Sequence, residues 1–124
     1  MRKNISSGGE MEPIMGYCRA VRIGNQVHVA GTTARPPEMF GDAYTQSVAA
    51  LDIIEKALNE AGAAISDVVR TVVYVTDIGE MEQVMRAHGE RFADIRPAST
   101  LIQVSAFLKP EMKVEIEAYA ILQD

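Results

Sequence analysis

The sequence RPASTLIQVSAFLKPEMKVEIEAYA, residues 96–120, decides how the rest of the chain is interpreted. Two runs of β-type composition, 99–105 and 113–119, flank a break at Lys109 and Pro110, which predicts two paired strands joined by an irregular turn. In the second run Glu115 and Glu117 alternate with aliphatic residues, so both carboxylates lie on one face of the strand. Such a carboxylate either faces solvent or lies in a functional site. For Glu115 the sequence leaves both interpretations open.

Length and composition indicate one globular domain, residues 1–124, large enough for a hydrophobic core. Hydrophobic residues make up 48% and charged residues 23%, which excludes a disordered chain. The single cysteine excludes an internal disulfide, and two histidines do not make a zinc site without carboxylate help. No apolar run approaches the ~20 residues of a membrane span, and no signal-peptide core is present. We therefore expect a cytoplasmic protein with no metal, no cofactor and no membrane partner.

The charge distribution argues against nucleic-acid binding. The net charge is −5, and the twelve lysines and arginines are scattered along the chain without an aromatic ladder. Binding to a phosphate backbone needs a basic stripe. We therefore predict no nucleic-acid partner.

Local patterns predict the order of the elements. A hairpin is expected where the runs 17–23 and 27–30 flank Gly24 and Asn25, and a short strand is possible around Ile5. Residues 31–41 form a loop, the kind of segment that often makes the wall of a site. Residues 68–76 predict a covered strand in the middle of the sheet because they are apolar on nearly both faces.

Two helices are expected on either side of that strand. The first is capped by Asp42 and closed by Gly62, and the second begins at Asp77 or Gly79 and ends before Pro97. Their apolar stripes predict these core positions: Val48, Leu51, Ile54, Leu58 and Ala61, then Met81, Val84, Met85, His88 and Phe92. We interpret the methionines as core filling and His88 as a packed histidine with one hydrogen-bonded ring nitrogen.

These elements predict an α+β two-layer domain, a mixed β-sheet with two helices on one face. Two helices cover only one face of such a sheet. The opposite face would then expose an apolar patch, for which we expect symmetric self-association.

Several segments resemble the Rid family, the YjgF-type reactive-intermediate deaminases. They are Tyr17-Cys18-Arg19-Ala20-Val21, Val29-Ala30-Gly31, DVVRTVVYVTD at 67–77, and PASTLIQV followed by VEIEAYA. The likeness extends over residues 12–122. It implies a chorismate-mutase-like fold assembled as a homotrimer around a central barrel, with clefts between subunits.

The resemblance also implies site residues. In the deaminases an arginine in a Pro-Ala-Arg-Ser motif holds the substrate carboxylate, and Ser99 stands at that position in this sequence. Ala30 replaces a serine of the family, whereas Tyr17 and the water-handling Glu115 are kept. The chain therefore resembles the subgroups of the family that lack the arginine. Losing a charge-assisted contact costs ~1.5–3 kcal/mol of binding free energy. Arg35 or Arg96 is a candidate to replace the missing arginine. The alternative for each is an arginine that is simply solvated in its loop.

The resemblance implies a hydrolase or deaminase acting on a small imine or enamine. Glu115 would handle the water, Tyr17 and Ser99 would orient the substrate, and amides near Ala30 and Gly31 would bind it. The alternative for Glu115 is a carboxylate paired with Lys113 or facing solvent. A non-catalytic small-ligand-binding or regulatory trimer is a second hypothesis for the whole chain. An RNA-related activity is a third, disfavoured by the charge.

Overall fold

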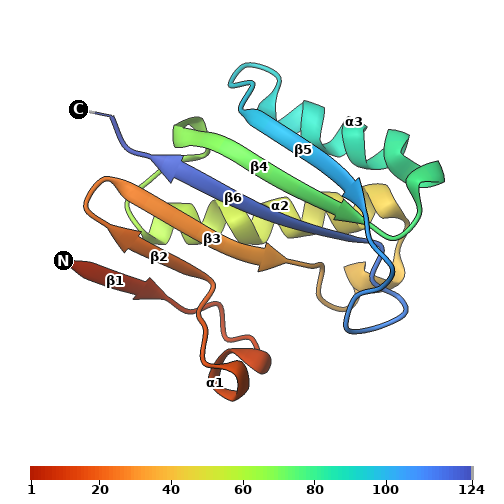
Figure 1. The fold of residues 1–124 in the computed structure, drawn as a ribbon, viewed down its shortest axis with the longest axis horizontal. Coiled ribbons are helices and arrows are strands. Elements are labelled where there is room, and N and C mark those ends of the chain that lie inside the picture. Colours follow the sequence, from red (N-terminus) through yellow and green to blue (C-terminus); the bar gives the residue numbers. More distant parts are fainter. Residues whose placement is uncertain (124) are drawn as a thin grey trace.

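The computed structural model describes residues 1–123, so Asp124, the last residue of the predicted domain, lies outside the described residues. Six strands form one sheet in the order β1-β2-β3-β6-β4-β5 (Figure 1). The strands are β1 (Arg2–Ile5), β2 (Ala20–Ile23), β3 (Gln26–Thr32), β4 (Val68–Val75), β5 (Ala98–Gln103) and β6 (Val114–Ile121). The α-helices are α1 (Met11–Met15), α2 (Ala43–Glu60) and α3 (Met81–Phe92). No helix within residues 1–123 is long and apolar enough to cross a membrane.

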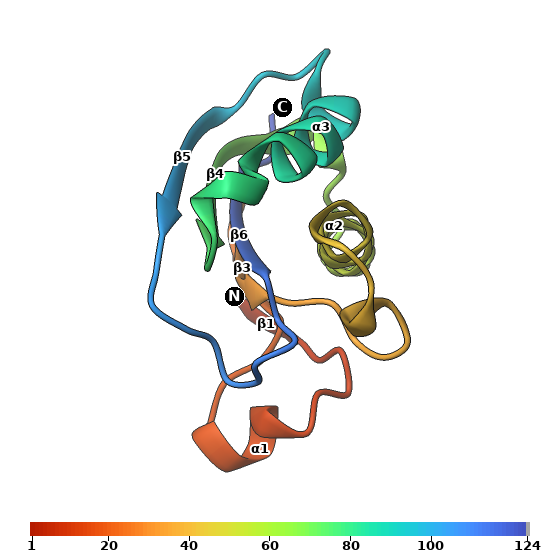
Figure 2. The same cartoon turned by 90° about the vertical axis from the view of Figure 1, so that its right-hand side faces the viewer.

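The helices α2 and α3 pack on the same face of the sheet and leave the other face bare (Figure 2). The predicted α+β fold, a mixed sheet with two helices on one face, is confirmed. The short helix α1 lies beyond the end of the sheet and was not predicted, because five residues show no usable period.

The strand β6 shows most directly how sequence alternation sets the two faces. Val114, Ile116, Ala118 and Ala120 are at most 1% exposed and pack beneath the helices. Glu115, Glu117 and Tyr119 therefore lie on the open face.

The predicted pairing of the last two strands is wrong. β5 pairs in parallel with β4, and β6 inserts between β3 and β4, antiparallel to both. The segment between β5 and β6 is a long connection over the end of the sheet and not a hairpin turn (Figure 1). Parallel strands require a crossover, and α3 provides it between β4 and β5.

The ends of α2 are fixed as predicted. The Asp42 carboxylate accepts a hydrogen bond from the Thr45 amide at 2.8 Å, and Gly62 follows the helix with a positive φ of 85°. Helix α3 begins at Met81, later than predicted, because a 3₁₀ turn at Ile78–Glu80 comes first.

Two predictions about apolar surfaces need correction. Met81 and Met85 are 40% and 54% exposed and do not fill the core, because the sheet ends at β5 and no segment within residues 1–123 covers that side of α3. The open face of the sheet is also less apolar than expected. Beside Val72 it carries Glu117, whose carboxylate accepts hydrogen bonds from the hydroxyls of Tyr74 and Tyr119.

Candidate functional site

A cleft of about 200 Å³ opens near the end of β3 and brings together four of the six predicted site residues. Its lining includes Tyr17, Gly31, Arg35 and Glu115, together with residues of the N-terminal segment and the connection before β6. Ala30 precedes Gly31 on β3 and is half-buried, but its side chain is not part of this lining. Ser99 is not part of it either.

Glu115 lies directly against Gly31. A Cβ atom added at Gly31 would lie 2.9 Å from the Glu115 carboxyl carbon and closer still to Oε1. The φ angle of Gly31 is not positive, so the glycine is needed for space and not for its backbone conformation. The pairing of β3 with β6 shifts register between Val29 and Thr32, and this irregularity carries Gly31 over the carboxylate.

The environment of Glu115 favours its neutral form. Burial raises the pKa of Glu115, the nearby Glu117 carboxylate raises it further, and the charge of Arg19 opposes both. Lys113, the alternative partner considered from the sequence, pairs with Glu80 at 3.5 Å. A half-buried carboxylate with a raised pKa next to open space has the properties of a group that exchanges protons with bound water.

Arg35 does lie at the cleft, but its guanidinium binds the N-terminal segment. Nη1 donates to the Ser7 carbonyl at 2.8 Å, and Nη2 donates to the Ser7 hydroxyl at 2.7 Å. Arg35 therefore holds residues 7–9 against the cleft. Arg35 is exposed, as in the solvated alternative that the sequence offered, but its guanidinium is hydrogen-bonded to Ser7.

The same N-terminal segment is held by a buried acid. Glu12 is 5% exposed, and its Oε2 accepts hydrogen bonds from the Ser7 amide, the Ser7 hydroxyl and the Gly9 amide. Burial by itself would raise the pKa of Glu12, but these hydrogen bonds outweigh it and lower the pKa to about 2.

Arg19 is the cleft residue that the sequence interpretation missed. In the sequence it is one of twelve scattered basic residues, yet in the structure it is 6% exposed and lines the cleft with Tyr17 and Glu115. The signal available in the sequence was its position two residues after Tyr17 in an extended run, which places both side chains on one face.

Ser99 lies on the helix side of the sheet, on the opposite face from Glu115. Thr71 on β4 pairs with Ser99 on one side and with the buried Ala118 on the other. The Thr71 hydroxyl contacts the Ser99 hydroxyl at 2.7 Å and Nε2 of His88 at 2.8 Å. This contact also confirms that His88 is packed with one ring nitrogen hydrogen-bonded.

Arg96, the other candidate anchor, is exposed and has a positive φ of 54° just after α3. Its amide donates to the Phe92 carbonyl and ends the helix. It does not line the cleft within its own chain.

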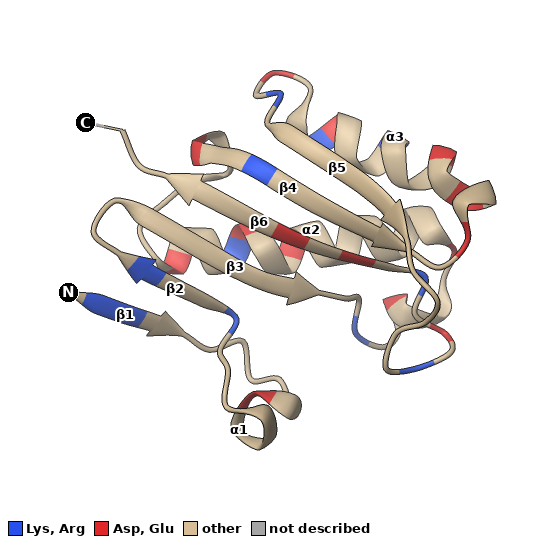
Figure 3. Ribbon diagram, viewed as in Figure 1, with Lys and Arg blue, Asp and Glu red and all other residues tan. Residues whose placement is uncertain are grey.

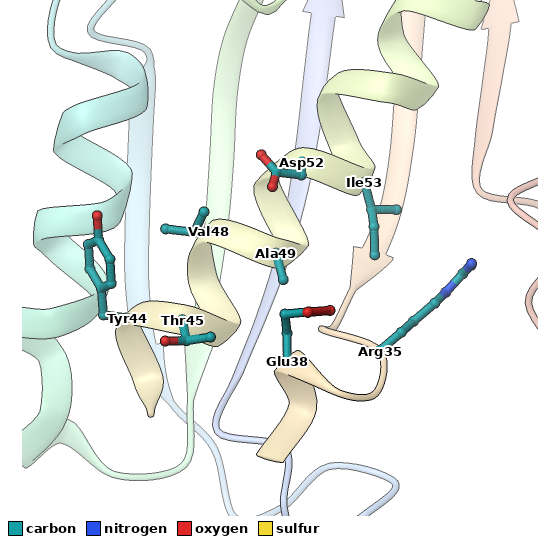
Figure 4. Close-up of a pocket in the computed structure, with 8 residues that line it drawn as sticks. All are labelled: Arg35, Glu38, Tyr44, Thr45, Val48, Ala49, Asp52 and Ile53. Carbon is teal, nitrogen blue, oxygen red and sulfur yellow. The ribbon is translucent and has the colours of Figure 1, made fainter. Parts of the chain in front are cut away.

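A larger groove, about 610 Å³, runs along the outer side of α2 (Figure 4). Two of its polar side chains are bound to residues outside the groove: Asp52 pairs with Arg91, and the Tyr44 hydroxyl donates to Glu90. Arg35 lines this groove as well as the cleft, but its guanidinium is bound to Ser7. Size alone therefore does not make it the better candidate site. Residues 1–123 also contain no cluster of three or more metal-ligating side chains.

Comparisons with known proteins agree with the fold. The model of the family described as endoribonuclease L-PSP matches residues 8–122. A crystal structure of Rv2704 from Mycobacterium tuberculosis, a member of the YjgF/YER057c/UK114 family, is 46% identical. It superposes with a TM-score of 0.93 over 98% of this chain and 100% of that one.

Two relatives show the range of what is known about similar sequences. An uncharacterized protein of Streptomyces coelicolor is 38% identical over 94% of this chain and 91% of its own length. The 2-iminobutanoate/2-iminopropanoate deaminase of Escherichia coli is 28% identical over 98% of both. With a family model that matches nearly the whole chain, the conclusion is direct: this protein belongs to the YjgF (Rid) family, whose model is named endoribonuclease L-PSP.

Proposed function

We propose that this protein hydrolyses a small imine or enamine in a cleft completed by a second copy of the chain in a homotrimer. The observation that supports the reaction most is the Glu115 carboxylate, seated over Gly31 with a pKa raised by burial. A relative of similar length is named as an imine deaminase.

The proposed reaction adds water across the C=N bond and expels ammonia. Glu115, in its ionised form, takes one proton from the attacking water as the oxygen bonds to carbon and passes it to the nitrogen, which gives a carbinolamine. The carboxylate then takes the hydroxyl proton as the C=O bond forms and gives it to the nitrogen as the C–N bond breaks, so ammonia leaves. An enamine first gains a proton on carbon and becomes the imine. The products are a carbonyl compound and ammonia, and no oxidant, reductant or metal is required.

The position of Ser99 supports the assembly. Within one chain Ser99 and Glu115 face opposite sides of the sheet, with β4 lying between β5 and β6. If Ser99 contacts the substrate, as its place in the family motif implies, it has to come from a neighbouring subunit. A serine at this position leaves the substrate without the arginine that the deaminases use.

The first experiment measures turnover of freshly generated 2-iminobutyrate and 2-aminoacrylate by following keto-acid formation. We expect wild-type protein to exceed the buffer rate and Glu115→Gln to lose at least about tenfold, equivalent to ~1.4 kcal/mol of transition-state stabilisation. Glu117→Gln is the matched control, since Glu117 lies on the same strand face but is bound by Tyr74 and Tyr119.

The results separate the alternatives. Full activity in Glu115→Gln would remove this residue from the mechanism. A wild-type rate equal to buffer, together with ligand-dependent thermal stabilisation, would point to the non-catalytic binding trimer.

An RNA-directed activity has less support in the charge distribution. Lysines and arginines are dispersed over several elements and form no continuous stripe within residues 1–123 (Figure 3), and the net charge is −5. Salt-dependent binding of RNA at physiological ionic strength would overturn this judgement.

A further inference from the structure

Arg19 is a buried cation in the wall of the cleft. The Ala30 amide donates to the Arg19 carbonyl at 2.8 Å, which extends the ladder between β2 and β3 to the level of the site. The side chain, 6% exposed, then lies in the cleft wall with Tyr17 and Glu115. Arg19 immediately precedes β2, and this backbone hydrogen bond ties it to β3.

The guanidinium contacts only neutral acceptors. Nη1 donates to the Gly31 carbonyl at 2.7 Å and to the Thr32 hydroxyl at 3.0 Å. Nε donates to the Ser7 hydroxyl at 3.2 Å, and Nη2 donates to the Tyr17 hydroxyl at 3.3 Å. These contacts orient the group, but none of them brings a negative charge.

No ion pair within residues 1–123 includes Arg19. Buried charges in proteins are normally paired, because removing an unpaired ion from water is costly. Glu115 is the acid whose charge Arg19 influences, yet burial disfavours the ionised form of Glu115 by raising its pKa. Arg19 therefore contributes a positive charge to the cleft wall, and within residues 1–123 no carboxylate contacts its guanidinium directly.

The donors that remain are placed side by side. A guanidinium has five N–H groups, and the four hydrogen bonds above leave one on Nη2 without an acceptor in the described part of the chain. The Tyr17 hydroxyl accepts from Nη2 and still has its own proton to donate. Two donors 3.3 Å apart can bind the two oxygens of one carboxylate.

We propose that Arg19, together with the Tyr17 hydroxyl, binds the carboxylate of an anionic substrate and replaces the arginine absent at position 99. This inference rests on the proposed function, because it assigns the charge of the substrate taken by the same cleft. It makes the substrate an imino or enamino acid and not a neutral imine.

The test compares two probes that are not turned over, 2-oxobutyrate and its neutral amide 2-oxobutanamide, by isothermal titration calorimetry. We expect wild-type protein to prefer the carboxylate by about ten- to a hundredfold, as for a charge-assisted contact. In Arg19→Gln this preference should fall close to one while the affinity for the amide stays within about threefold. If Arg19 had only a structural role, Arg19→Gln would lower the affinity for both probes by the same factor.

Arg22→Gln is the matched control. Arg22 lies three residues further along the same extended run, but it donates to the Gly24 and Ala61 carbonyls outside the cleft. It should keep the wild-type preference. Arg19→Lys, which keeps the charge but loses the fork, should have an intermediate preference.

A second variant keeps the inference testable if Arg19→Gln does not fold. Tyr17→Phe removes one of the two proposed donors, so the carboxylate preference should fall severalfold with little change for the amide. An undiminished preference in a folded Arg19→Gln or in Tyr17→Phe would overturn the inference.

The outcome also distinguishes this inference from the proposed function. A carboxylate preference that depends on Arg19, without turnover of any imine, would support Arg19 as the carboxylate-binding residue and contradict the proposed hydrolysis. Turnover of imines with no preference for the carboxylate probe would support the proposed hydrolysis and contradict the role of Arg19. A wild-type protein that binds neither probe would overturn the anchor.

Discussion

At the scale of single residues, the cleft depends on a close fit between Gly31 and Glu115. The carboxylate occupies the space that any side chain at position 31 would fill. Burial of the carboxylate at this position is the largest cause of the raised pKa of Glu115, and the Glu117 carboxylate adds to it.

Gly31→Ala tests this fit. The added methyl would meet the end of the Glu115 side chain, which can rotate away, so the free energy of unfolding should fall by less than about 1 kcal/mol. Turnover should fall by at least about tenfold, because the carboxylate leaves its position. In a Glu115→Ala background the same change should cost no further activity, and an additional loss there would contradict this explanation.

Glu12 gives a prediction about acid stability. The pKa of Glu12 is lowered in the folded protein to about 2, so its contribution to stability is present above the unfolded value of 4.5. That contribution is lost as the pH falls toward 2. Glu12→Gln should therefore lower the free energy of unfolding by about 2 kcal/mol at pH 7, and the difference from wild type should shrink below pH 4.5.

Denaturant unfolding measured from pH 7 to pH 2.5 checks this prediction. Glu10→Gln is the control, because Glu10 is exposed on the same segment. A deficit in Glu12→Gln that stays constant with pH would rule out the hydrogen-bonded carboxylate as its source.

At the scale of elements, the ends of α2 and the interior of α3 show two different uses of glycine. Gly62 follows α2 with a positive φ of 85°, and an added Cβ would lie 2.7 Å from Nη1 of Arg22. Gly89 lies within α3, and nothing is within 4 Å of the position of its Cβ. One glycine is required by the turn, whereas the other only weakens a helix.

The two alanine variants should therefore differ in sign. Gly62→Ala should lower the free energy of unfolding by about 1–2 kcal/mol, because an L-residue with a Cβ is strained in the left-handed region. Gly89→Ala should raise it by about 0.5–1 kcal/mol through higher helix propensity. Thermal and denaturant unfolding of both variants check this prediction. If Gly62→Ala changed the free energy of unfolding by the same amount and sign as Gly89→Ala, Gly62 would not be the residue that ends α2.

At the scale of the whole molecule, the sheet separates two groups of polar side chains. Glu115 lies on the open face, whereas Ser99 lies with Thr71 and His88 on the helix side. The proposed trimer joins these groups between subunits, and this proposal has a quantitative consequence.

Co-expression of Ser99→Trp and Glu115→Gln chains tests it. Each variant alone should have little activity, because every cleft contains one altered residue. In random mixed trimers about one quarter of the clefts combine an intact Ser99 from one chain with an intact Glu115 from another. We therefore expect about a quarter of wild-type turnover, and no recovery in trimers confirmed by native mass spectrometry would contradict a shared cleft.

The sequence alone determined the two long helices, the type of the main strands, the two faces of β6 and the caps of α2, but not the short helix α1. These features depend on local periodicity and on residues with special backbone preferences, such as Asp42 and Gly62. It also singled out Tyr17, Gly31, Arg35 and Glu115, which the structure brings to one cleft.

Only the tertiary structure decided which strands pair and which charges meet. The insertion of β6 between β3 and β4 depends on contacts distant in sequence, which local alternation cannot specify. The burial of Arg19 and the binding of Arg35 to Ser7 also depend on contacts between segments that are distant in sequence. The partners of a charged side chain are therefore known only once these segments have folded together.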